Sequence, residues 1–143
     1  MLKELLSKQK SSLVYEAIEE ILKMLEGAGR MFAISCDFDS SDEESAQILA
    51  QSDREINMGE RLVRRLIFQH LTVNPQYDLP ASLAILSIIH DVERLGDYAK
   101  NLFELNQWGD LCSKGSLHRK RYAEIRVLVE PLFSSTMDAL GYD

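Results

Sequence analysis

The sequence predicts an all-α fold, an antiparallel up-down bundle of three to four long helices. Apolar residues recur at alternating spacings of four and three along four long segments, the pattern of helices that pack on other helices. No segment shows the alternating apolar and polar pattern of a half-buried strand. The segments joining the helices are short, which favours antiparallel neighbours. We therefore interpret residues 1–143 as one domain.

The first two helices are predicted over residues 5–35 and 41–72. Either Ser40 with Glu43 or Ser41 with Glu44 supplies a capping box for the second helix. The core positions expected on the first helix are Val14, Ile18, Ile21, Leu25, Ala28 and Phe32. Those expected on the second are Leu49, Ser52, Ile56, Gly59, Val63 and Leu66.

The other two helices are predicted over residues 78–107 and 117–140. Asp78 is the expected N-cap of the third helix, and Pro131 is expected to kink the fourth, which would close a four-helix bundle. The core positions expected on the third helix are Ile85, Ile88, Val92, Leu95, Ala99 and Leu102. Those expected on the fourth are Tyr122, Ile125, Val129, Leu132, Thr136 and Ala139.

Composition and charge exclude several classes of function. A net charge of −7 argues against nucleic acid as a partner and permits cations or basic proteins. The longest uncharged stretch in an apolar segment, residues 79–90, is too short to cross a bilayer, so direct membrane insertion is not expected. The first residues lack the apolar core of a signal peptide, and a cytoplasmic location is the simplest interpretation. Cys36 and Cys112 fit no metal or redox motif.

Two polar stripes are the candidate functional residues. Glu93 and Asp97 lie four apart and share a helix face, which the predicted seam directs away from the core. Asp53, Asn57 and Glu60 form a similar stripe on the second helix, which would lie beside the first stripe if the two helices pack antiparallel. Such oxygen ligands suit hard cations such as Mg, Ca, Mn or iron. The alternative is a set of solvated surface acids, and the sequence leaves both open.

The other motifs carry less chemistry. His90-x-x-Glu93 reverses the Glu-x-x-His order of di-iron bundles, and no nucleophile with a partnered base or phosphate-binding loop is found. Gly96 lies in mid-helix, where a glycine is unfavourable and is easier to understand if another backbone comes close. The basic run at residues 118–121 is typical of a solvated face. An enzyme is therefore not expected; the rival hypothesis is a metal-dependent enzyme or metal-storage bundle using the same acids.

With both stripes in view, the chain resembles the PhoU family of phosphate-transport regulators. The resemblance rests on Asp53-Arg-Glu-Ile-Asn57-Met-Gly-Glu60, on Asp78-Leu-Pro80 and on Asp91-Val-Glu93-Arg-Leu-Gly-Asp97-Tyr-Ala-Lys-Asn101. It implies a helical bundle that restrains phosphate uptake by contact with other proteins. The implied partners are a phosphate-transporter ATPase, a sensor kinase or the membrane domain of a sodium–phosphate cotransporter, whose cytoplasmic tail such a domain can form. It also implies a surface metal site at Asp53, Asn57, Glu60, Glu93 and Asp97, for iron or another cation such as Mg, Mn, Ca or Zn.

The chain departs from the family pattern in two respects. It carries one copy of motifs that family members commonly have twice, and a homodimer is expected to restore the missing contact. Asn57 stands where the family motif has Asp, which makes one ligand neutral and weaker.

Overall fold

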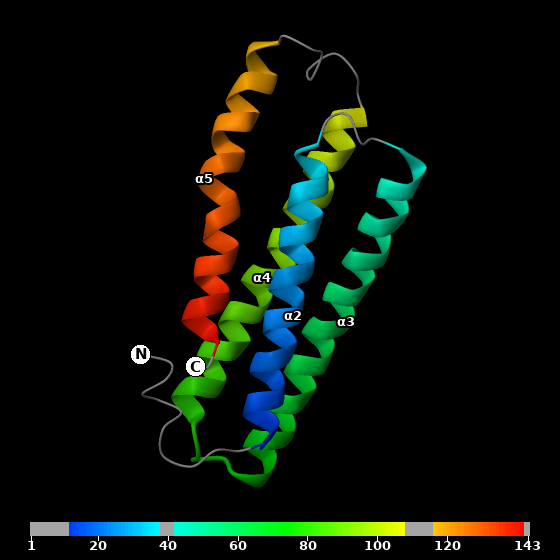
Figure 1. Ribbon diagram of the computed structural model, residues 1–143. Helices are drawn as coiled ribbons and strands as arrows, with labels where there is room; N and C mark the ends of the chain where they lie inside the picture. The colour runs from blue at the N-terminus through cyan, green and yellow to red at the C-terminus, as the bar shows by residue number, and fades with distance from the viewer. Residues whose placement is uncertain (1–11, 38–41, 108–115, 142–143) are drawn as a thin grey trace.

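The computed structural model describes residues 12–37, 42–107 and 116–141, and these form four helices (Figure 1). The helices are α2 (Ser12–Ser35), α3 (Glu43–Val73), α4 (Leu79–Gln107) and α5 (Leu117–Leu140). No strand occurs in these ranges, so the predicted all-α bundle is confirmed. The predicted helix ends agree within two residues, except that residues 5–11 of the first predicted helix lie outside the described ranges.

The helices form a three-helix bundle with a fourth helix laid along one side. Antiparallel α2, α3 and α4 all pack on one another, whereas α5 packs chiefly on α2. In Figure 1, α5 and α3 lie on opposite sides of α2. The expected closure of a four-helix bundle is incomplete, because α5 packs on α2 while an open groove lies between α5 and α4.

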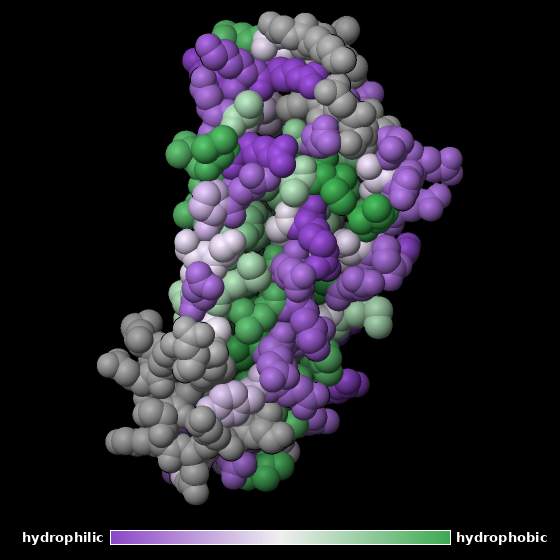
Figure 2. Space-filling model, in the orientation of Figure 1, coloured by the Kyte–Doolittle hydropathy of each residue, from purple (hydrophilic) through white to green (hydrophobic). Residues whose placement is uncertain are grey.

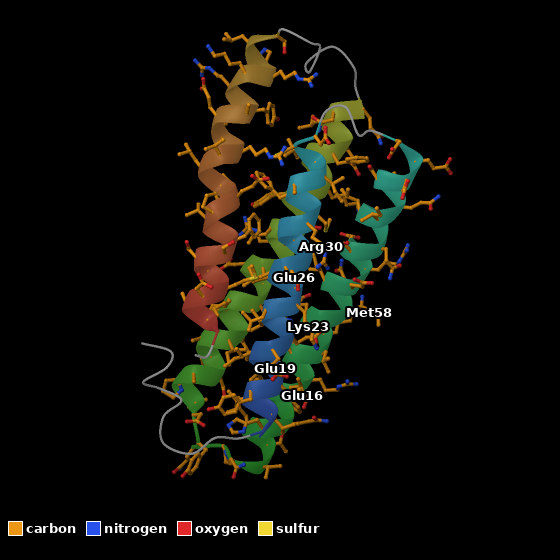
Figure 3. The ribbon with its side chains drawn as sticks, viewed as in Figure 1. Glu16, Glu19, Lys23, Glu26, Arg30 and Met58 are labelled. Atoms are coloured by element: carbon orange, nitrogen blue, oxygen red, sulfur yellow. The ribbon has the colours of Figure 1, made fainter. Side chains whose placement is uncertain are left out.

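The predicted core positions of α2 and α3 are confirmed. Those of α3 are all buried, and those of α2 are buried except Phe32, which packs partly exposed against the core. Charged residues line the outer edge of α2, as Figure 3 shows for Glu16, Glu19, Lys23, Glu26 and Arg30. In Figure 2 this edge is a polar ridge, with apolar atoms between it and α5. The charged edge and the apolar seam together fix how α2 is turned in the bundle.

The predicted register of α4 is half right. Ile85, Val92 and Ala99 are buried as expected, but Leu95 is 38% exposed. The remaining core positions are shifted by one residue from those predicted, to Ile89, Gly96 and Phe103. Both sets keep a 4-3 alternation, and the true one includes a glycine that an apolar count overlooks.

The predicted seam of α5 is wrong. No α5 residue is buried, and Ile125 and Leu132 are largely exposed. Phe133 instead contacts the core, with its ring centroid 5.8 Å from that of Phe32, and Met137 and Leu140 pack beside it. The helix turns this narrower stripe inward because α2 is its main neighbour.

The N-terminus of α3 is capped by Asp42, whose side chain accepts a hydrogen bond of 2.8 Å from the Ser45 backbone N–H. The predicted caps Ser40 and Ser41 lie outside the described residues. A serine box had been expected, but Asp is an equally good N-cap.

At the start of α4, the Asp78 carbonyl accepts a hydrogen bond of 2.8 Å from the Ser82 N–H. Asp78 has a φ of 52°, which lies in the left-handed region. An N-cap residue usually has an extended backbone, so Asp78 departs from the conformation expected of the predicted N-cap.

A buried polar contact joins the end of α2 to α4. The Ser35 hydroxyl lies 2.7 Å from the Met31 carbonyl and 2.6 Å from that of Ala99, and Asn106 donates to the Ser35 carbonyl. Cys36 lies next to it, and burial raises the pKa of its thiol. None of the described helices is both long enough and apolar enough to cross a membrane.

Candidate functional site

The two polar stripes flank the interface between α3 and α4. Asp53 and Glu60 each follow a buried seam position of α3, and Glu93 follows the buried Val92 of α4. Their side chains are only 18–19% exposed. The expectation that the Glu93 stripe points away from the core is therefore wrong for Glu93, because the core positions of α4 are shifted. Asp97, one turn further along, is exposed as predicted.

The antiparallel register brings the stripes together. Lys100 of α4 lies with its Nζ 3.5 Å from Oδ2 of Asp53 on α3. Counting back seven residues on α4 and forward seven on α3 places Glu93 opposite Glu60. The predicted adjacency of the two stripes is thus present in the structure.

The electrostatics of Glu93 reflect this adjacency. Burial raises the pKa of its carboxyl group, and the negative charges of Asp97, Glu60 and Asp53 raise that pKa further. His90 acts in the opposite direction, with its Nδ1 3.7 Å from Glu93 Oε2. Acidic side chains of both α3 and α4 therefore contribute to the raised pKa of Glu93.

Basic side chains already neutralise part of this acidity. Arg64 contacts Glu60 on its own helix at 2.6 Å, and Lys100 reaches Asp53 from across the interface. Asn57 turns its amide back, and Nδ2 donates to the Asp53 carbonyl at 2.9 Å. Sequence reasoning missed the contact of Arg64 with Glu60 and that of Lys100 with Asp53. The spacing of Arg64 four residues after Glu60 was a usable signal, whereas Lys100 could be found only from the register.

Glycines let the helices approach beside the acids. A Cβ at Gly96 would lie 3.0 Å from Cδ1 of Ile56, and one at Gly59 would lie 2.7 Å from Cγ of Met24. The neighbours of Gly96 are the side chains of Ile56 and Met31, so the approach of another backbone expected at this glycine is not found. The absence of a Cβ instead leaves room for the Ile56 side chain of α3 against α4.

The oxygen atoms of the two polar stripes are of the kind that binds a hard cation, but they are not arranged around a common point. Carboxylate oxygens are suitable ligands. Within residues 12–37, 42–107 and 116–141, no group of three or more His, Cys, Asp or Glu side chains is arranged to hold a metal ion. Arg64 and Lys100 would compete with a bound cation for the Glu60 and Asp53 carboxylates. The metal site at Asp53, Asn57, Glu60, Glu93 and Asp97 stays a prediction.

Comparison with known proteins gives one match. The family model of the PhoU domain matches residues 21–105, which include both polar stripes and most of the three-helix bundle. Neither the search of curated proteins nor the search of solved structures found a match.

Proposed function

The chain belongs to the PhoU family, and from this premise we propose that it regulates phosphate uptake or phosphate signalling without catalysis, by contact with other proteins. The observation that carries the proposal is the family match over the segment that holds the acidic edge of α3 and α4. We define this acidic edge as Asp53, Asn57, Glu60, Glu93 and Asp97. The family is one of phosphate-transport regulators.

The acidic edge is the surface we propose for this contact. The side chains of Asp53, Glu60 and Glu93 are partly buried, so packing restricts the positions of their carboxylates. A partner that presents basic side chains there would relieve the mutual repulsion around Glu93. In the cytoplasm, such a partner would be a phosphate-transporter ATPase, a sensor kinase or the membrane domain of a cotransporter.

Deletion of the gene tests the regulatory proposal. In phosphate-rich medium, deletion should raise phosphate uptake and derepress phosphate-starvation genes, and the wild-type gene should restore both. Unchanged phosphate responses in the deletion strain would contradict the proposal. Metal-dependent turnover by the purified protein, together with that result, would favour the rival enzyme.

Cation binding at the same edge is the second part of the proposal. A cation would offset the clustered negative charge, and binding to the folded state alone would raise the melting temperature. Mn²⁺, Mg²⁺ and Fe²⁺ titrations should therefore raise the Tm of the wild type by a few degrees. The Glu60→Gln/Glu93→Gln variant should lose this rise, whereas Glu16→Gln/Glu19→Gln, on the exposed edge of α2, should keep it. Equal rises in both variants would place any cation elsewhere.

A further inference from the structure

The outer face of α5 carries an apolar stripe that no other described helix covers. Ile125, Leu128 and Leu132 are 53%, 71% and 60% exposed. They follow one another at spacings of three and four, so they share one helix face. Phe133 and Met137 meet the core from a different face. Helix α5 is thus apolar on two faces, of which the described chain covers one, and large exposed apolar patches mark interaction sites.

An open groove of about 380 Å³ runs beside this stripe, between α4 and α5. Val129 lies on its α5 wall, four residues after Ile125 and three before Leu132, so the stripe and the groove are adjacent. The groove is lined almost entirely by apolar side chains: Phe32, Leu95, Tyr98, Ala99, Leu102, Leu105, Val129 and Phe133. The two features form one apolar surface that offers room for a helix.

The charges of α5 indicate which helix could occupy this apolar surface. The basic run at residues 118–121 lies at the helix N-terminus, and Asp138 lies near its C-terminus. Each has the sign that the helix macrodipole disfavours at that end. A second α5 lying antiparallel would set the basic end of each copy beside Asp138 and the C-terminal carbonyls of the other. A two-fold axis near Leu128, the middle of α5, produces this match at both ends.

We infer that this surface binds a second copy of the chain, with the two α5 helices antiparallel about a two-fold axis. The stripe of each copy covers the groove of the other, so the contact is the same on both sides. The predicted homodimer thereby gains a defined interface. This inference is independent of the phosphate-regulation proposal, since its test measures mass and proximity.

Sedimentation over a wide range of concentrations tests the dimer. The wild type should sediment at twice its 16.3 kDa mass, and Leu128→Glu should halve that value to the monomer mass. Because Leu128 is 71% exposed, the variant should keep the wild-type circular dichroism. Phe68→Glu is the matched control: Phe68 is 73% exposed on α3, a helix that lies across α2 from α5 (Figure 1), and this variant should stay dimeric.

Cross-linking tests the position of the interface. Leu128 lies near the proposed axis, so Leu128→Cys should give a disulfide-linked dimer under mild oxidation. Phe68→Cys should not exceed the background that the native cysteines give in the wild type. A wild type that sediments at 16.3 kDa at every concentration would overturn the inference. So would a dimer that neither Leu128→Glu disrupts nor Leu128→Cys links.

Discussion

Glu93 is the residue at which packing and charge oppose each other most directly. Its place beside Val92 buries most of its side chain, and three neighbouring acids disfavour its charge. Only His90 favours the charged form among the causes of the shifted pKa. Folding therefore places an ionised group where it is less stable than in water.

Glu93→Gln should stabilise the protein at neutral pH. The pKa of Glu93 is raised in the folded state, so the ionised side chain destabilises folding above that pKa. The cost disappears as pH falls below the unfolded pKa, where the group is protonated in both states. Relief of like-charge repulsion should add about 0.5 kcal/mol at pH 7, and less at each lower pH. Urea unfolding in chelator from pH 4 to 8 measures this; a destabilised variant with no pH dependence would contradict it.

A second prediction concerns Asp42, the cap of α3. Hydrogen bonds from Ser45 lower the pKa of its carboxyl group, so its contribution to stability is present above the unfolded pKa and lost as pH falls through the folded one. Asp42→Ala should lower the melting temperature at pH 7. Asp42→Asn should retain most of the cap but lose its pH dependence. Equal melting temperatures for all three proteins would show that the cap does not contribute.

Among the helices, those with a charged outer edge were the most predictable. The seams of α2 and α3 could be located from the sequence because charged residues border them. On α4, apolar residues occupy both candidate registers, and the buried one includes Gly96. Counting apolar residues therefore favours Ile88, Leu95 and Leu102 over the positions that are buried. On α5, the more apolar stripe faces outward and the less regular one meets α2. Sequence periodicity does not distinguish an apolar helix face that is buried in the core from one that is exposed at the surface.

The register of α4 can be tested with two adjacent isoleucines. Ile89 is fully buried, whereas Ile88 lies only partly buried beside the core. Ile89→Ala should cost about 2–5 kcal/mol of unfolding free energy, because it leaves a cavity in the bundle. Ile88→Ala should cost clearly less. A larger loss at Ile88, measured by chemical unfolding, would restore the register expected from the sequence.

In the molecule as a whole, two stripes of acids distant in the sequence form one edge. Their existence and residue types could be predicted, and so could their adjacency once antiparallel packing was assumed. Their partial burial and the contacts of Arg64 and Lys100 could not, because these depend on the rotation and register of α4 against α3. Because Arg64 and Lys100 already contact these acids, oxygen ligands of a suitable kind are present without being arranged around a cation.

Complementation of the deletion strain tests whether the acidic edge carries the regulatory contact. Two variants change the net charge equally: Glu60→Gln/Glu93→Gln on the acidic edge, and Glu16→Gln/Glu19→Gln on the outer edge of α2. Both should fold and accumulate like the wild type, as immunoblots and circular dichroism would check. Phosphate uptake in phosphate-rich medium should stay derepressed with the first variant and return to the wild-type rate with the second. Full repression by the first variant, at wild-type protein levels, would contradict the claim.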